Sequence, residues 1–189
     1  MSGAGSIRAM HPLFQAGEDG SIPIPALSAK ALRVDGIAFE HARDLNRVWH
    51  SRLPRFGTGA VKNPGKRFAC YGARHGERLY AVAIWSAPAA RELPQSDWLE
   101  LRRLATAPDA PKNTCTRMLR IMEILIRKTR PELVRLISYQ DSRAHTGAIY
   151  KAAGWTRTVV KRGAEWDCPS RPRPKAQTAA DKYRWEKIL

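Results

Sequence analysis

Long apolar runs are missing from this sequence of 189 residues. No segment approaches the ~20 apolar residues of a membrane-spanning helix, so we expect no membrane partner. The first residues, MSGAGSIRAMHPLF, show neither an uninterrupted apolar stretch nor a small-residue cleavage site, so we expect no secretory signal and a cytoplasmic location. Cysteine is also scarce: Cys70, Cys115 and Cys168 form no C-x-x-C pair, which argues against a disulfide framework or a structural zinc site.

Acidic residues are few, with 17 Asp and Glu against 33 Lys and Arg, which gives a formal net charge of +16. Residues 41–67 hold seven basic residues and one acid, and residues 161–189 hold eight basic residues and four acids. Because Lys and Arg that neutralise phosphates release bound counterions, a polyanionic partner such as nucleic acid explains this charge. A surface that is basic for solubility alone is the alternative.

The chain length and a hydrophobic content of 43% predict one domain with a buried core. We place a lead-in at residues 1–30, the folded domain at 31–162 and a basic, proline-rich tail at 163–189. Apolar spacing and turn residues predict, in chain order, a helix over 39–53, a hairpin of strands over 67–73 and 79–86, a strand over 98–106, a helix over 113–130, a strand over 132–141, a helix over 145–154 and a strand over 155–160. This order predicts an α/β fold in which helices flank a mixed central sheet.

The strand, turn and helix over 98–130 are typical of an anion-binding site. A helix N-terminus presents N–H groups without intrahelical partners at the positive end of the helix dipole, which suits the pyrophosphate of a nucleotide cofactor. An ordinary capped helix is the alternative reading of the same residues. The candidate cofactor-binding residues are Lys112, Asn113, Thr114 and Arg117, with Arg102, Arg103 and Leu104 on the preceding strand.

The segment after the strand over 132–141 carries a second motif. A tyrosine-bearing helix is followed by "GW", and with the order of elements this resembles the acetyltransferase fold known as GNAT; the residues are Ile149, Tyr150, Ala153, Gly154 and Trp155. The resemblance implies acetyl-CoA as cofactor, bound where the strand over 132–141 splays away from its neighbour. The GNAT loop pattern Q/R-x-x-G-x-G/A is replaced here by A-P-D-A-P-K-N-T-C-T.

Longer strings over roughly residues 40–160 resemble the Mom family of phage DNA-modification proteins. The strings are WHSRLP at 49–54, ELRRL at 100–104, APKNTCTRML at 110–119 and LISYQDSRAHTGAIYKAAGW at 136–155. The resemblance implies an enzyme that converts adenine N6 in double-stranded DNA to a carbamoylmethyl (acetamido) derivative and so protects phage DNA from restriction in the host cytoplasm. The new bond would join N6 to the methyl carbon of an acetyl unit, which attack on a thioester carbonyl alone does not form.

Two residues are candidates for the group that accepts the proton of adenine N6. Asp141 ends a predicted strand, at the sheet edge where α/β folds bind ligands, and His50 ends a predicted helix. A positioned base contributes about 10²–10⁴ in rate. We assign Tyr139 and Ser51 as their hydrogen-bond partners, and Tyr150 as the acid that protonates a departing thiolate, as a tyrosine does in many GNAT enzymes. Each of these also has a structural alternative, such as a helix cap.

Three further assignments concern metal and DNA. His50, Asp141 and His145 could bind iron if they converge. Base chemistry on a duplex requires the nucleotide to leave the stack, and flat side chains usually hold it. Trp49 is the favoured stacking residue over Tyr139 and over Trp85, which ends a hydrophobic strand. The other candidate DNA contacts are Arg52, Arg55, Lys62 and Lys66.

Two other functions fit the same sequence. A GNAT N-acetyltransferase acting on a small-molecule or protein amine would favour an acidic acceptor pocket, which the basic charge opposes. A catalytically inactive, GNAT-like nucleic-acid-binding module would keep the charge without needing both His50 and Asp141.

Overall fold

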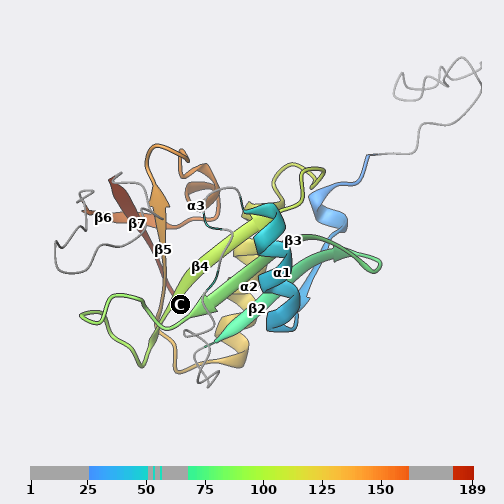
Figure 1. Ribbon diagram of the computed structural model, residues 1–189. Coiled ribbons are helices and arrows are strands. Elements are labelled where there is room, and N and C mark those ends of the chain that lie inside the picture. The colour runs from blue at the N-terminus through green and yellow to red at the C-terminus, as the bar shows by residue number, and fades with distance from the viewer. Residues whose placement is uncertain (1–25, 51–52, 54–55, 57–67, 162–180) are drawn as a thin grey trace, which may run out of the picture.

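One mixed sheet organises the molecule (Figure 1). The structure, a computed structural model, describes residues 26–50, 53, 56, 68–161 and 181–189. The strands lie in the order β1-β2-β3-β4-β5-β7-β6. Their bounds are β1 (Arg33–Gly36), β2 (Ala69–His75), β3 (Arg78–Ser86), β4 (Trp98–Thr106), β5 (Arg135–Asp141), β6 (Thr156–Lys161) and β7 (Lys182–Ile188). The helices are η1 (Ala29–Ala31), α1 (Phe39–Trp49), α2 (Thr114–Thr129) and α3 (Ala148–Ala152). The predicted α/β fold with helices flanking a mixed sheet is confirmed.

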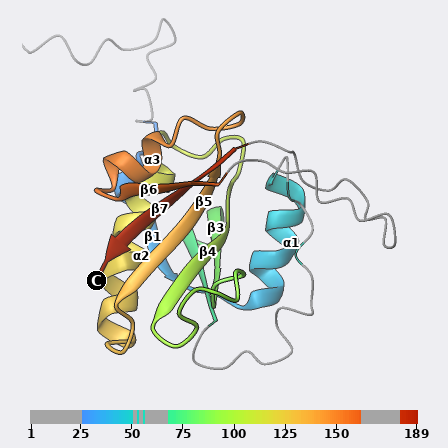
Figure 2. The same cartoon turned by 90° about the vertical axis from the view of Figure 1, so that its left-hand side faces the viewer.

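Helices cover both faces of this sheet (Figure 2). α1 lies over β2, β3 and β4 on one face. α2 lies on the opposite face, where its apolar residues recur every three or four positions and pack against the sheet. The α1 side buries Ala42, Phe56, Cys70, Val82, Ile84 and Ala105. The larger core on the α2 side includes Trp85, Leu99, Leu101, Met118, Leu119, Met122, Ile126 and Leu136.

Strands β4 and β5 part halfway along their length. They pair in parallel from Trp98 opposite Arg135 to Leu101 opposite Ser138. Beyond that pair, β4 continues to Thr106 with β3 as its partner, whereas β5 continues to Asp141 with β7 as its partner. The splayed strand that the GNAT resemblance implies is therefore present, and it opens next to the N-terminus of α2.

The C-terminal residues depart from the predicted tail. Lys182–Ile188 form β7, which lies between β5 and β6 and pairs antiparallel with both. Alternation explains the strand, because Tyr183 and Trp185 face the core on the α2 side while Arg184 and Glu186 face the other way. The part of the chain in the sheet therefore extends beyond residue 162, and the segment 162–180 links its last two strands.

Smaller differences concern the ends of elements. α1 ends at Trp49, four residues before the predicted end, with the His50 amide donating the last helical hydrogen bond to Asn46. The hairpin, β4, α2 and β5 lie where the apolar pattern predicts them. None of the helices in the described ranges is long and apolar enough to cross a membrane.

Candidate active site

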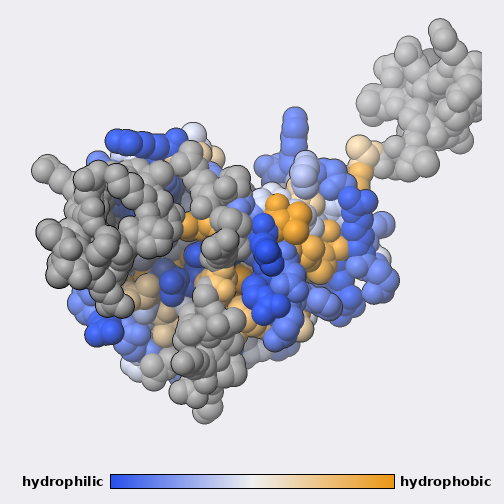
Figure 3. All heavy atoms as spheres, in the orientation of Figure 1, coloured by the Kyte–Doolittle hydropathy of each residue, from blue (hydrophilic) through white to orange (hydrophobic). Residues whose placement is uncertain are grey.

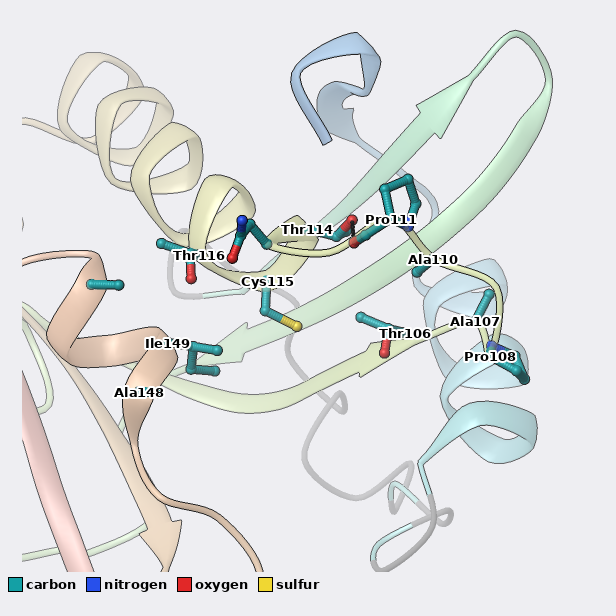
Figure 4. Close-up of a pocket in the computed structure, with 12 residues that line it drawn as sticks. Thr106, Ala107, Pro108, Ala110, Pro111, Thr114, Cys115, Thr116, Ala148 and Ile149 are labelled. Atoms are coloured by element: carbon teal, nitrogen blue, oxygen red, sulfur yellow. Dashed lines mark hydrogen bonds between the residues drawn. The ribbon is translucent and has the colours of Figure 1, made fainter. Parts of the chain in front are cut away.

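A cavity of about 360 Å³ lies between the N-terminus of α2 and α3, beside the parted end of β4 (Figure 4). Its lining is uncharged, with small side chains and hydroxyl groups. The lining residues are Thr106, Ala107, Pro108, Ala110, Pro111, Asn113, Thr114, Cys115, Thr116, Ala148, Ile149 and Ala152. None of these twelve residues is charged, so an anion in the cavity would depend on backbone N–H groups for its stabilisation.

The backbone at the start of α2 provides the donors of this cavity. Asn113 adopts a left-handed conformation (φ 68°), which asparagine tolerates better than most residues and which makes the sharp entry into the helix. The Thr114 amide and hydroxyl both donate to the Pro111 carbonyl, at 3.2 and 2.6 Å. Helix geometry leaves the next amides, of Cys115 and Thr116, without intrahelical acceptors, and both residues line the cavity.

Only part of the predicted cofactor set surrounds the cavity. Asn113 and Thr114 line it, but Lys112 and Arg117 do not. The Arg117 guanidinium instead donates to the Leu32 carbonyl, at 3.4 and 3.5 Å. Leu104 packs against the core on the α2 side. The lining residues that sequence reasoning missed are Thr106, Cys115, Thr116 and those of the Ala107–Pro111 turn and α3. The turn has no glycine pattern, so no sequence signal marked its residues.

A pair of hydroxyl groups marks the point where β4 and β5 part. The Ser138 and Tyr150 hydroxyl oxygens are 2.8 Å apart, and the Ser138 hydroxyl also lies 3.4 Å from the Leu101 carbonyl oxygen. Burial raises the pKa of Tyr150 to about 12. Tyr150 is therefore protonated at neutral pH and held at the branch of the two strands. Sequence reasoning named Tyr150 as a candidate and did not name Ser138, to which it is hydrogen-bonded.

A second set of contacts holds the turn that follows β5. The Trp185 ring stacks on Tyr150, with ring centroids 5.4 Å apart, and its Nε1 donates to Gln140 Oε1 at 2.7 Å. The Gln140 amide in turn donates to the His145 carbonyl. Gly147 has a positive φ of 77°, and a Cβ there would lie 2.6 Å from Trp185, which explains the glycine. Strand β7 thus braces the residues around Tyr150.

On the opposite face, Leu53 is hydrogen-bonded to both α1 and β4. The Leu53 carbonyl accepts hydrogen bonds from Asn46 Nδ2 and Arg103 Nε, both at 3.2 Å. The Leu53 amide donates to His50 Nδ1 at 3.1 Å. Burial lowers the pKa of His50, and the positive charges of Arg103 and His145 lower it further. His50 therefore stays neutral at pH 7, and because its Nδ1 is an acceptor, the ring proton is on Nε2.

Arg102 and Arg103 lie away from the cavity, contrary to their predicted place beside the cofactor pyrophosphate. The β3–β4 register shifts between Ile84 and Trp85, so Arg102 is the extra residue of a β-bulge. Both guanidinium groups lie over the Phe56 ring, in the core on the α1 side. The bulge is a long-range property of strand pairing, and the local sequence carries no sign of it.

Asp141 lies at the end of β5, as predicted, and caps the turn that follows. Its carboxylate accepts a hydrogen bond from the Arg143 amide at 2.9 Å, and its carbonyl accepts from Ala144 and His145. Strand alternation places it on the same face as Tyr139, opposite to Ser138 and Gln140. The local contacts of Asp141 are therefore those of a capping residue. Asp141 also lies at the edge of the sheet where β4 and β5 part.

The remaining candidates divide into three groups. Trp49 packs half-buried against the core on the α1 side, whereas Trp85 is fully buried and donates to Met122 Sδ, so Trp85 is a core residue and not a stacking residue.

In the part of the chain that the structure describes, no three His, Cys, Asp or Glu side chains are grouped to hold a metal ion. The iron assignment to His50, Asp141 and His145 is therefore not supported. Ser51, Arg52, Arg55, Lys62 and Lys66 lie outside the described residues.

Solved structures share this architecture. An acetyltransferase from Bacillus subtilis in complex with CoA superposes with a TM-score of 0.55 at 16% identity, covering 84% of this chain and 99% of that chain. A ribosomal-protein-S5-alanine acetyltransferase from Vibrio fischeri gives a TM-score of 0.59 at 10% identity, over 84% and 93% of the two chains. NAA60 from Arabidopsis thaliana, in complex with a bisubstrate analogue, gives 0.59 at 12% identity, over 83% and 97%.

The seven-stranded order, the parted strands and these similarities define a protein with the GNAT acetyltransferase fold. Among curated proteins, none matches the sequence. The model of the Mom protein family matches residues 64–176, and the chain belongs to this family. The predicted family and fold are both confirmed.

Proposed function

We propose that this protein is an acetyl-CoA-dependent transferase that converts adenine N6 in DNA to a carbamoylmethyl derivative and thereby protects phage DNA from host restriction. The observation that carries the proposal is the parting of β4 and β5 beyond the Leu101–Ser138 pair. An uncharged cavity with backbone donors lies on one side of the parted strands, and His50 and Arg103 lie on the other, the α1 side that faces the viewer in Figure 3. A cofactor and a polyanionic acceptor can therefore approach one point from opposite faces.

In this proposal, the acetyl-CoA pyrophosphate binds at the N-terminus of α2. The Cys115 and Thr116 amides and the positive end of the helix dipole stabilise its negative charge. The lining offers hydroxyl groups and no carboxylate, which fits the anionic character of the cofactor. The glycines of the GNAT loop pattern Q/R-x-x-G-x-G/A are absent from this chain. Asn113, in its left-handed conformation, makes the turn into α2 instead.

Tyr150 is the acid in this proposal. The amide of the product forms when an ammonia-level nitrogen donor displaces the CoA thiolate from the thioester carbonyl, and that thiolate needs a proton. The buried Tyr150 hydroxyl keeps its proton at neutral pH because its pKa is about 12. The Ser138 hydroxyl, 2.8 Å away, holds it at the branch of β4 and β5. The pair therefore lies where the cofactor would enter between the strands.

Asp141 and His50 act on the acceptor in this proposal. Adenine N6 is a weak nucleophile because its lone pair is delocalised into the ring, and it loses one proton when the N6–CH2 bond forms; we assign acceptance of that proton to the Asp141 carboxylate. Bonding N6 to the acetyl methyl carbon removes one hydrogen from each partner, so this step also needs a two-electron oxidant. The neutral His50 offers an N–H donor at Nε2 and orients the acceptor. Tyr139, on the same face as Asp141, and Ser51 are their proposed hydrogen-bond partners. Trp49 is the proposed stacking residue for the extruded base.

Mass analysis of nucleosides tests this function. The protein is expressed with a plasmid, the plasmid is digested to nucleosides, and deoxyadenosine is examined for the mass of one added carbamoylmethyl group. Asp141→Ala and His50→Ala should abolish the added mass while DNA binding is retained. Unmodified deoxyadenosine together with acetylated small amines or proteins would identify an N-acetyltransferase. DNA binding without any product would identify an inactive nucleic-acid-binding module.

A further inference from the structure

The Ser138 hydroxyl has two oxygen neighbours but only one hydrogen to donate. Its Oγ lies 2.8 Å from the Tyr150 hydroxyl oxygen and 3.4 Å from the Leu101 carbonyl oxygen. A carbonyl oxygen only accepts, whereas either of two hydroxyl groups can donate to the other. When Ser138 donates to Leu101, Tyr150 donates to Ser138; when Ser138 donates to Tyr150, the Tyr150 hydrogen is released to another acceptor. The same two hydrogens therefore have two arrangements.

Little opposes a change from the first arrangement to the second. Hydrogen bonds between oxygens usually span about 2.5–3.0 Å, so the 3.4 Å contact with Leu101 is long and weak, whereas the 2.8 Å contact with Tyr150 is of ordinary length. Turning the Ser138 hydrogen toward Tyr150 gives up the weak contact and keeps the short one. The change needs only a rotation of the Ser138 hydroxyl, so the backbone can stay where it is.

The surroundings of Tyr150 make this donor important once the tyrosine loses its proton. Ser138 and Tyr150 are only 2% and 8% exposed. The rings of Trp155 and Trp185 lie against the Tyr150 ring, with centroids 5.7 and 5.4 Å away, and the Trp185 N–H is already donated to Gln140. A buried charge without a partner is costly. A phenolate at Tyr150 would therefore depend on Ser138, its hydrogen-bond partner within the described part of the chain.

The second arrangement also leaves the Tyr150 hydrogen close to the cavity. Ile149, the residue before Tyr150 on α3, lines the cavity, and so does Cys115 (Figure 4). Cys115 is close enough to Tyr150 for its charge to raise the pKa of the tyrosine. The hydroxyl that would release a proton therefore borders the space in which the proposed function places the cofactor.

We propose that Ser138 is a positioning residue for Tyr150, whose hydroxyl hydrogen turns from the Leu101 carbonyl to the Tyr150 oxygen as Tyr150 gives up its proton. This rests on the acid role of Tyr150 in the proposed function and deepens it by naming the group that stabilises the acid after transfer. The Tyr150 O–H bond breaks, the proton goes to the sulfur of the departing thiolate, and the electron pair stays on the phenolate oxygen. The nitrogen donor loses one proton as it becomes the amide, which balances the proton that Tyr150 regains. Ser138 keeps its own proton throughout.

Titration of Tyr150 tests this hydrogen bond without substrate or DNA. The protein is prepared with fluorotyrosine, whose ring fluorine lowers the pKa of the phenol, and fluorine NMR follows each tyrosine against pH. The signal that Tyr150→Phe lacks identifies Tyr150. Ser138→Ala should move its titration to higher pH, because the phenolate loses a donor, and Ser138→Thr should restore it by keeping a hydroxyl. The control Ser86→Ala removes a buried strand hydroxyl that donates to the Ala87 carbonyl, and it should leave the titration unchanged.

Turnover separates positioning from a purely structural role. Ser138→Ala should lower kcat about tenfold, with KM for acetyl-CoA and the unfolding temperature little changed, because Ser138 is not among the residues that line the cavity. The inference is overturned by an unmoved Tyr150 titration in Ser138→Ala, by a folded Ser138→Thr that titrates like Ser138→Ala, or by equal losses of kcat in Ser138→Ala and Ser86→Ala. A shifted titration in a protein that adds no mass to deoxyadenosine would refute the proposed function and leave the hydrogen bond standing. Modified adenine with an unmoved titration would do the reverse.

Discussion

The hydroxyl groups of Ser138 and Tyr150 meet 2.8 Å apart at the last residue pair that joins β4 to β5. One hydroxyl comes from the strand that turns away and the other from α3, which borders the cavity. The branch of the sheet and the proposed acid therefore form a single structural unit.

Tyr150→Phe removes the hydroxyl but keeps the ring that stacks on Trp185. If Tyr150 protonates the departing thiolate, product formation should fall by about 10²–10⁴, measured as modified deoxyadenosine per enzyme. CoA affinity and the unfolding temperature should change little, because the cavity lining and the ring packing are retained. Ser138→Ala is the matched control and should cost less, since it leaves the acid in place. Full product formation by Tyr150→Phe would reject this role.

Gly147→Ala should destabilise the fold. The residue combines a φ of 77° with a close approach to Trp185, 2.6 Å from an added Cβ, so both backbone strain and a clash oppose the substitution. We expect a loss of about 1–3 kcal/mol in the free energy of unfolding, measured in urea. Gly76→Ala is the control, because its φ is 56° but nothing lies within 4 Å of the added Cβ. Equal losses in the two variants would show that the Trp185 contact carries no cost.

Glu186 should make stability depend on pH. Burial alone would raise its pKa, but the hydrogen bond from Thr158 and the charges of Arg184 and Arg135 outweigh burial and lower it below 4.5. A lowered folded-state pKa stabilises the protein above the unfolded value, and the stabilisation is lost as the pH falls through the folded value. Urea unfolding should therefore show a loss below pH ~4.5 that Glu186→Gln reduces. The exposed Glu77→Gln should leave the curve unchanged; a curve for Glu186→Gln that matches the unsubstituted protein would contradict the assignment.

His50 and Arg103 should be electrostatically coupled. Burial is the main cause of the lowered pKa of His50, and the charge of Arg103 is the next. Arg103→Gln removes that charge, so the pKa of His50 should rise, measured by NMR titration of the imidazole. The acidic limb of the rate profile should move to higher pH in the same direction. Arg127→Gln, on the exposed end of α2, should leave the imidazole titration where it is, and a His50 titration that Arg103→Gln does not move would show that the two side chains are uncoupled.

Local patterns predict much of this fold, and the misses have a common cause. The apolar stripe of α2 and the apolar runs of β4 and β5 depend on neighbouring residues, and the structure places these elements as predicted. Strand β7 was missed because its alternation of charged and aromatic residues resembles an amphipathic tail, and its partners lie elsewhere in the chain.

The residues of the candidate site also divide into those that local motifs predict and those that depend on distant strand pairing. Asn113, Thr114 and Tyr150 follow from local motifs, and the structure places them at the cavity or beside it. Arg102 and Arg103 could not be placed from sequence, since their direction depends on a register shift between β3 and β4. A single extra residue in a strand reverses the face to which the next side chain points.

The position of β7 has a consequence for biosynthesis. β6 leaves the ribosome before β7, yet it reaches the sheet only through β7, which separates it from β5. A nascent chain that ends before residue 182 therefore exposes the edge of β5 and lacks the Trp185 ring against Tyr150. The proposed acid acquires its final packing only when the last strand has been translated, so a truncated product would carry the cavity residues without a properly assembled centre.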